Sequence, residues 1–502
     1  MEKAISRIEQ AILLHEKVLI YGDYDVDGTT AVSIIYSFFK KYHSEMEFYI
    51  PDRYKEGYGV STQGIDYAAR NGFSLIIALD CGIKSVDKVD YAHSLGIDFI
   101  ICDHHLPGDV LPAAAAVLDP KRGDCAYPYK ELSGCGIGFK LIQAFSIRKA
   151  LPFKEIVQFL DLVAVSIAAD IVPITGENRV LTFHGLKRLN SEPCKGLSAL
   201  MDVSDKKNTY TLTDVVFSLA PRINAAGRID DARHAVNLLV AEDHELALSK
   251  GMLIDLKNTE RKEHDSSITE QALLMIEQDS SLITRKTTVV YDESWHKGVI
   301  GIVASRLIER YYRPTVVLTR SNGHVAGSAR SVAGFDLYQA LDSCSDLLDQ
   351  FGGHKYAAGL TMKPENIPAF QDRFEQVVSA SIAEDLLVQQ INIEACIPLS
   401  HITPRFVRIL SQFAPFGPQN LAPVFLTRGV RVYGQATVVG GKHLKLVVRQ
   451  DDQTLFNCIA FGMADFESRV NTGLPFDICY TIEENIWKEK RTLQLNVKGI
   501  RA

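Results

Sequence analysis

The segment 17-KVLIYGDYDVDG-28 decides how the N-terminal part of the chain folds. Its apolar run predicts a buried strand. Asp23, Asp25 and Asp27 follow at every second position, so on an extended chain they point to the same side. Neighbouring carboxylates repel one another, and a divalent cation removes that repulsion. Because carboxylate oxygens suit Mg²⁺ or Mn²⁺, the segment predicts a metal site at the end of a strand.

Two other interpretations fit parts of this segment. A solvated acidic turn stays open on this motif alone. An EF-hand loop also opens with Asp-x-Asp-x-Asp-Gly, but it needs a bidentate acid at its twelfth position. Ile34 stands at that position here, and the motif follows a strand rather than a helix. The sequence therefore argues against a calcium loop.

The first 120 residues alternate β-rich runs with helical stretches, which predicts a parallel, doubly wound sheet. Ligands on such sheets bind beyond the carboxyl ends of the strands. Asp80 and Asp103 each follow a predicted strand, as Asp23 does, so we expect these acids to meet at one sheet edge. Strands are expected at 18–21, 47–51, 75–79, 98–102 and 115–118, and helices at 29–42, 61–71 and 84–95.

A chain of 502 residues is too long for a single core. The pattern of predicted helices and strands changes three times along it. We expect an α/β catalytic domain at 1–190, a helical connector at 191–285, a second α/β domain at 286–378 and an all-β module, plausibly a small barrel, at 390–502. The charge run at 255–264 predicts a solvated helix face. The glycine-rich segment 133–138 is interpreted as a packing loop.

Charge is spread unevenly along the chain. The net charge is −7, but residues 395–502 carry 13 Lys/Arg against 8 Asp/Glu. An acidic body suits metal ions, and a basic tail suits a polyanion. No long uncharged apolar run exists, and the nine cysteines form no C-x-x-C pair. These features predict a cytoplasmic protein with free thiols and argue against a zinc site or a membrane span.

Two further motifs carry candidate ligands. Asp103-His104-His105 ends a predicted strand, where one imidazole can take a metal and the other the substrate. Asp170 lies among the apolar residues of 167–173, where a carboxylate is costly unless it is paired or bound to metal. Helix capping is the alternative for Asp170.

The order of these motifs resembles the DHH phosphoesterase superfamily. Further segments resemble, within it, the RecJ family of single-strand-specific exonucleases, and the resemblance covers essentially the whole chain. These segments lie at 51–59, 220–228, 295–304, 327–331 and 351–354. Some members carry a histidine where Tyr21 stands, and members usually have several dozen residues before the segment that begins here at Met1.

The resemblance implies a metal-dependent 5′-to-3′ exonuclease that hydrolyses phosphodiester bonds of single-stranded DNA in recombination and repair. It implies that Asp103 orients His104, and that His105 faces the scissile phosphate, with Asp80 completing the catalytic group. The second α/β domain would be DHHA1-like and the β module an OB-fold. The residues implied to hold two Mn²⁺ or Mg²⁺ ions are Asp23, Asp25, Asp27, Asp80, His104 and Asp170.

Candidate substrate contacts lie mostly in the second α/β domain. Its glycine-rich segments suit a phosphate, with tight turns as the alternative, and Trp295 could stack on a base or belong to the core. In the β module, Tyr433 and Phe461 are candidate base platforms. The full candidate set is Arg53, Arg222, Asn224, Arg228, Trp295, His296, Gly327, Ser328, Arg330, Ser331, Gly353, His354, Arg431 and Lys445.

Two rival functions remain open at this stage. One is a DHH-family phosphodiesterase or phosphatase for short oligonucleotides or cyclic dinucleotides. The other is a DNA-binding scaffold with a dead site. The expected partners are single-stranded DNA with a 5′ end, a helicase and a single-strand-binding protein, and the expected state is a monomer.

Overall fold

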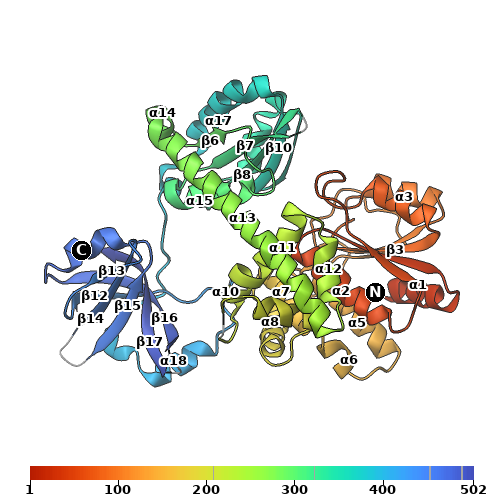
Figure 1. Cartoon of the computed structure of the whole chain (residues 1–502), viewed down its shortest axis with the longest axis horizontal. Coiled ribbons are helices and arrows are strands. Elements are labelled where there is room, and N and C mark those ends of the chain that lie inside the picture. The colour runs from red at the N-terminus through yellow and green to blue at the C-terminus, as the bar shows by residue number, and fades with distance from the viewer. Residues whose placement is uncertain (207, 322, 451–453, 488–489, 502) are drawn as a thin grey trace. The chain divides into compact units, whose positions relative to one another are not determined.

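The computed structural model describes residues 1–501 apart from 207, 322, 451–453 and 488–489, with no account of the side chains of 485–491. It divides into two compact units (Figure 1). The first comprises residues 1–172 and 176–389, and the second comprises residues 173–175 and 390–502. None of the helices in the described part combines the length and apolarity that a membrane crossing requires.

A five-stranded parallel sheet organises the N-terminal half of the first unit. Its strand order is β2 (Met46–Tyr49), β1 (Lys17–Gly22), β3 (Phe73–Leu79), β4 (Asp98–Cys102), β5 (Ala116–Leu118). The three central strands are buried along nearly their whole length because helices cover the sheet. The prediction of a parallel, doubly wound sheet is confirmed. Its helices are α1 (Glu2–Leu13), α2 (Val26–Phe39), α3 (Thr62–Arg70), α4 (Val86–Ser94), α5 (Gly134–Arg148), α6 (Lys154–Val157) and α7 (Leu160–Ala169).

The acidic segment after β1 differs from the extended chain that alternation suggested. The strand ends at Gly22, and α2 already begins at Val26. Asp25 is the N-cap of this helix and accepts a hydrogen bond from the Gly28 N–H at 3.0 Å. Asp27 lies in the first helical turn and is buried. Aspartate is among the favoured N-cap residues. The chain therefore starts a helix at this point and does not continue as an extended strand.

A helical region follows the sheet, and its longest helix is the 35-residue α13 (His244–Gln278). The prediction of a solvated face at 255–264 is wrong in part, because Asn258 and Arg261 are buried and Asp255 pairs with Arg222. Helix α11 packs against α13 and brings Arg222 to it. The other helices here are α8 (Gly176–Leu189), α9 (Lys195–Asp202), α10 (Leu212–Asp214), α11 (Ala220–Ile229), α12 (Arg233–Leu239) and α14 (Ser280–Thr284).

A second sheet completes the first unit. Its order is β6 (Thr288–Tyr291), β7 (Thr315–Ser321), β8 (His324–Arg330), β10 (Ala357–Met362), β9 (Gln350–His354). Segments 327–330 and 352–354 belong to antiparallel strands, not to the tight turns given as the alternative. A Cβ atom at Gly327 would lie 2.6 Å from the end of the Leu318 side chain, so a larger residue at this position on β8 would displace that side chain. The helices here are α15 (Ile300–Tyr311), α16 (Leu337–Asp342) and α17 (Ile367–Ser381).

The C-terminal unit is a closed five-stranded barrel, as expected for an OB-fold. Strands β12 (Phe425–Val432), β16 (Phe476–Trp487), β17 (Lys490–Arg501), β15 (Leu455–Ala460) and β14 (His443–Arg449) pair in that order, and β14 pairs back to β12. A core with Tyr480, Leu444 and Val430 fills it. The remaining elements are β11 (Ala395–Cys396), β13 (Thr437–Val439), α18 (Pro404–Ser411) and α19 (Glu467–Val470).

Candidate metal centre and phosphate pocket

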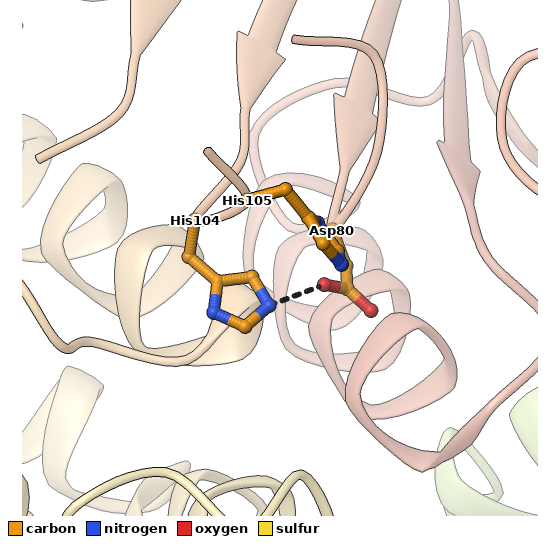
Figure 2. A group of neighbouring side chains, drawn as sticks. All are labelled: Asp80, His104 and His105. Atoms are coloured by element: carbon orange, nitrogen blue, oxygen red, sulfur yellow. Dashed lines mark ion pairs between the residues drawn. The ribbon is translucent and has the colours of Figure 1, made fainter. Parts of the chain in front are cut away.

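The carboxyl ends of β1, β3 and β4 bring the predicted acids to one edge of the first sheet. Asp80 follows β3, and Asp103 and His104 follow β4, all buried. Asp80 has a left-handed backbone with φ of 60°, which is uncommon outside glycine and is tolerated by Asp and Asn. This conformation lies where β3 turns away from the sheet, and Figure 2 shows its carboxylate beside the His104 ring.

His104 lies at the centre of a group of carboxylates. Its Nε2 atom is 3.1 Å from Asp80 Oδ1, 3.5 Å from Asp170 Oδ2 and 3.7 Å from Asp27 Oδ2. His104 follows β4 and Asp80 follows β3. Asp170 lies at the end of α7, and Asp27 lies at the start of α2. Residues as distant in sequence as Asp27 and Asp170 therefore converge on one imidazole. Two groups, Asp80 with His104 and His105, and Asp27 with His104 and Asp170, place their ligand atoms close enough for a metal.

Several buried polar atoms in this group have no hydrogen-bond partner among the residues that the structure describes. They are Asp23 Oδ2, Asp80 Oδ1 and both ring nitrogens of His104. Unpaired buried acceptors are costly, so native proteins normally satisfy them. Carboxylate oxygens and an imidazole are suitable ligands for Mn²⁺ or Mg²⁺. The residues present therefore fit a divalent cation.

The carboxyl groups repel one another strongly without a cation. Burial, followed by the charges of Asp27 and Asp25, raises the pKa of Asp80 and of Asp170 well above the usual range. Burial and the charge of Asp25 do the same to the pKa of Asp23. Burial lowers the pKa of His104, which keeps its imidazole neutral, the form that ligates a metal.

Asp27 is held by the start of α5. One of its oxygens accepts hydrogen bonds from the Cys135 N–H and the Ser166 hydroxyl at 2.7 Å, and the other accepts the Gly134 N–H at 2.6 Å. The positive end of a helix dipole favours such an anion. The interpretation of 133–138 as a loop is therefore wrong, because the segment caps and starts α5. Ser166 was not singled out from the sequence, since its contact spans 139 residues.

Asp103 orients His105 and not the ring of His104, which corrects the role inferred from the resemblance. Its Oδ1 lies 2.7 Å from His105 Nδ1 and accepts the His104 backbone N–H, also at 2.7 Å. The Ile83 N–H donates to its other oxygen. Burial opposes ionisation of Asp103, yet the His105 hydrogen bond holds its pKa below the usual range. Conversely, burial opposes protonation of His105, but Asp103 raises its pKa.

The two remaining acids of the first segment lie at the side of this group. Asp25 caps α2 and is partly exposed. Asp23 is buried, and its Oδ1 accepts the Gly59 N–H at 3.3 Å. Tyr21, which stands where some family members have histidine, donates its hydroxyl to the Gly59 carbonyl and supports the same loop. Tyr21 thus helps to fix Gly59, whose N–H contacts Asp23.

Sequence reasoning missed two side chains near the centre. Asp119 follows β5 at the same sheet edge, is buried and has an unpartnered Oδ2 atom. Burial raises the pKa of Asp119 to about 6. The rule that identified Asp80 and Asp103, an acid directly after a strand, would also have found it. The other is Tyr58, whose hydroxyl lies 2.9 Å from His105 Nε2.

A cavity of about 560 Å³ lies between the first sheet's loops and the second sheet, within the first unit. It brings together Arg53, Arg228 and Arg330 with Gly327 and Ser328, five of the residues predicted to contact the substrate. None of the three guanidinium groups has a carboxylate partner among the described residues. Burial, followed by the charges of Arg53 and other arginines, lowers the pKa of Arg228 to about 10. Three unpaired cations around a cavity suit a phosphate.

Other candidate residues lie elsewhere in the first unit. Trp295 is only 4% exposed and donates its indole N–H to Gln271, which supports the core alternative over base stacking. Arg222 pairs with Asp255 at 2.8 Å, and the Ser331 hydroxyl donates to the Phe335 carbonyl. These three side chains therefore have structural partners. Asn224 on α11 and Gly353 on β9 are not among the residues lining the cavity.

Two candidate histidines lie near the cavity without lining it. His296 stacks on His264, with ring centroids 5.3 Å apart, in a separate cavity of about 500 Å³. His354, on β9, lies close enough to His105 for that charge to lower its pKa, after burial. His354 is therefore the candidate of the second sheet that approaches the metal centre.

The barrel presents its candidate residues on the surface. Tyr433 and Phe461 are more than half exposed, as base platforms must be. Lys445 lies on β14 with its side chain exposed. Arg431 donates to the Gly473 carbonyl and is also exposed. Exposed aromatic rings and cations of this kind suit a single strand.

Three family models match successive parts of the chain. They are the DHH family N-terminal domain at 17–167, the DHHA1 domain at 284–380 and the RecJ OB domain at 393–499. Among curated proteins, the single-stranded-DNA-specific exonuclease RecJ of Bacillus subtilis is 37% identical over 502 residues, covering 99% of this chain and 63% of that protein. RecJ of Escherichia coli is 32% identical, covering 100% of this chain and 90% of that protein.

Solved structures agree with these matches. RecJ of Thermus thermophilus in complex with Mn²⁺ is 27% identical with a TM-score of 0.86, covering all of this chain and 71% of that chain. The same protein in complex with Mg²⁺ is 26% identical with a TM-score of 0.80, covering all of this chain and 70% of that chain. This chain thus spans less than two thirds of the length of the Bacillus protein. It spans nine tenths of the length of the Escherichia protein. It belongs to the RecJ family of the DHH phosphoesterase superfamily.

Proposed function

We propose that this chain is a metal-dependent exonuclease that removes nucleotides from the 5′ end of single-stranded DNA in recombination and repair. The observation that carries the proposal is the presence of both a carboxylate–histidine centre and a pocket of unpaired arginines in one compact unit. Its curated relatives carry the name single-stranded-DNA-specific exonuclease.

The metal centre would perform the hydrolysis. Asp23, Asp25, Asp27, Asp80, His104 and Asp170 would hold two Mn²⁺ or Mg²⁺ ions, the ions bound in the Thermus relative. When bound, such ions neutralise phosphoryl charge and make a water molecule nucleophilic near neutral pH. His105, fixed by Asp103, would direct Nε2 at the scissile phosphate and donate a hydrogen bond to it. This step requires no nucleophilic side chain.

The arginine pocket would set the direction of attack. A terminal phosphate carries more negative charge than an internal phosphodiester, so unpaired arginines favour a 5′-phosphorylated end. Ser328 and the backbone around Gly327 add donors. A strand anchored by its 5′ end would present a nearby phosphodiester to the metal centre. The barrel would bind the rest of the strand through stacking and backbone contacts.

The decisive experiment digests single strands labelled at the 5′ or the 3′ end, with Mn²⁺, Mg²⁺ or a chelator. We expect a 5′ label to be released first as short product, only with a metal present. Release from the 3′ end would reject the polarity. Cleavage of dinucleotides or cyclic dinucleotides, with long strands left intact, would instead favour the rival phosphodiesterase. Binding without cleavage under all conditions would favour a scaffold.

The pocket has its own test in Arg330→Gln. Loss of one charge-assisted hydrogen bond should raise KM for 5′-phosphorylated strands by about 10-fold or more. KM for 5′-hydroxyl strands should change little. Arg320→Gln, which removes a cation from an exposed ion pair on β7, is the matched control and should leave both values unchanged. An equal rise in KM for both strands would show that Arg330 does not read the terminal phosphate.

We also propose, from the family resemblance, that the protein works as a monomer beside a helicase and a single-strand-binding protein. Co-purification of the full chain with candidate proteins of each class, and sedimentation of the purified chain, test these points.

A further inference from the structure

His105 has a hydrogen-bonding contact at both of its ring nitrogens, unlike its neighbour His104. Asp103 Oδ1 lies 2.7 Å from Nδ1, and the Tyr58 hydroxyl lies 2.9 Å from Nε2. The Tyr58 ring also meets the imidazole edge-on, with centroids 5.8 Å apart. In the described part of the chain, His104 Nδ1 has no partner, and His104 Nε2 lies 3.1 Å from Asp80 Oδ1 without hydrogen-bond geometry. The two adjacent histidines are thus prepared differently, one for a cation and one in a fixed orientation.

Tyr58 is itself placed by residues of the phosphate pocket. Its ring packs edge-to-face on Tyr24, with centroids 6.2 Å apart. The Arg53 guanidinium lies 4.9 Å from the centroid of the Tyr24 ring. All three side chains line the 560 Å³ cavity. Tyr58 therefore lies between the arginines that would take the 5′ phosphate and the imidazole of the metal centre.

We propose that Tyr58 is a positioning residue, whose hydroxyl lies at His105 Nε2 and fixes the ring until the scissile phosphate takes its place at that nitrogen. The inference rests on the proposed function and deepens it. With Asp103 alone, only Nδ1 is held, and a combined rotation about both side-chain bonds can tilt the ring about that contact and misdirect Nε2. A second contact at the opposite nitrogen fixes the ring plane before the substrate binds. Orientation established in advance contributes to rate and not to ground-state affinity.

The test compares Tyr58→Phe with the wild-type full chain on 5′-phosphorylated single strands. The phenylalanine keeps the ring and its packing on Tyr24 but removes the hydroxyl. Loss of one neutral hydrogen bond should lower kcat by about 3- to 10-fold with KM nearly unchanged. Tyr67→Phe removes a hydroxyl that donates to Glu47 in the same domain and should leave both constants unchanged. An unchanged kcat in Tyr58→Phe would overturn the proposal.

A double-mutant cycle with His105→Gln, run as single-turnover rates, asks whether the hydroxyl acts through the imidazole. If it does, adding Tyr58→Phe to His105→Gln causes no further loss. An equal loss in both backgrounds overturns the proposal, since Tyr58 would then act on the substrate directly.

A measurement without substrate separates this inference from the proposed function. In full-length protein labelled with ¹⁵N-histidine, the His105 signals are assigned by their absence in His105→Gln. Tyr58→Phe should shift the Nε2 resonance, and Tyr67→Phe should not. An unshifted resonance overturns the proposal. A wild-type chain that cuts no single strand rejects the proposed function instead, while the resonance still reports on the Tyr58 contact.

Discussion

Asp80 combines an uncommon backbone conformation with a buried, unpaired carboxylate. Its φ of 60° places the side chain beside His104 Nε2, and within the described residues its Oδ1 accepts no hydrogen bond. Left-handed backbone in a non-glycine residue costs on the order of 1 kcal/mol and concentrates at functional sites. This combination makes Asp80 a strong candidate for a metal ligand.

We expect Asp80→Asn to lower the exonuclease rate by about 100-fold or more, since a bound metal contributes several kcal/mol to such reactions. Asparagine also tolerates left-handed backbone, so the fold should be kept. Affinity for single strands, measured by fluorescence anisotropy, should stay within about 2-fold, because the pocket and barrel that would supply it are unchanged. Rapid cleavage by this variant at high Mn²⁺ would show that Asp80 is not essential for metal binding.

The raised pKa values of Asp23, Asp80 and Asp170 predict how stability depends on pH. A carboxyl group with a higher pKa in the folded than in the unfolded protein binds more protons when folded. It therefore lowers the stability of the metal-free protein as pH rises from about 4 toward the folded pKa. Cations bind the deprotonated group and reverse this loss.

We accordingly expect the Tm difference between Mn²⁺-loaded and chelator-treated protein to increase from about pH 5 to about pH 8. Differential scanning fluorimetry measures it, with Asp80→Asn as the variant in which the increase is smaller. A Tm difference that is constant across this range would mean that these carboxyl groups do not titrate against the metal.

At the scale of the element, the start of α5 approaches the metal centre closely enough to require glycine. A Cβ atom on Gly134 would lie 2.6 Å from Asp80 Cβ and 2.8 Å from its Oδ1. The same backbone donates to Asp27. Helix α5 therefore fixes two of the candidate ligand carboxylates, Asp27 by a hydrogen bond and Asp80 by close contact.

Gly134→Ala should destabilise the protein by about 1–3 kcal/mol, the usual cost of overpacking, and lower metal affinity because Asp80 must move. Urea unfolding and Mn²⁺ titration measure the two effects. Gly123→Ala is the matched control, since a Cβ there meets no atom within 4 Å. If both variants behave alike, the close approach of α5 has no role in the site.

Sequence position predicted much of this site, because acids that follow parallel strands must meet at one edge. That rule placed Asp80, Asp103 and His104 correctly, and it would have placed Asp119. It failed where local preference reshaped the chain, as at Asp25, which caps α2. The sequence spacing of Asp103, His104 and His105 also does not predict which of the two imidazoles Asp103 contacts, because the contact depends on the direction of the chain after β4.

Contacts between distant segments were beyond reach of the sequence alone. Ser166 meets Asp27 across 139 residues, and Tyr58 meets His105 across 47. Trp295 shows the reverse difficulty, because an indole is equally suited to a core and to a base. Only packing against α13, where Gln271 accepts its N–H, distinguishes the two.

At the scale of the whole molecule, charge separates the metal-holding unit from the barrel. The barrel's exposed Lys445 should contact the DNA backbone, so Lys445→Gln should reduce the slope of log K against log salt by about 0.7 for long single strands. Anisotropy titrations at several salt concentrations measure this slope. Lys187→Gln removes an exposed cation from α8 in the other unit and should leave the slope unchanged. Equal slopes for all three proteins would reject Lys445 as a DNA contact.

The buried oxygens and nitrogens of the candidate metal centre that have no partner among the described residues also affect how long the protein survives in a cell. A chain without its cations spends more of its time unfolded, and unfolded chains are the substrates of proteases. When manganese and magnesium are scarce, we expect the protein to become less abundant, and its half-life after synthesis is stopped to shorten.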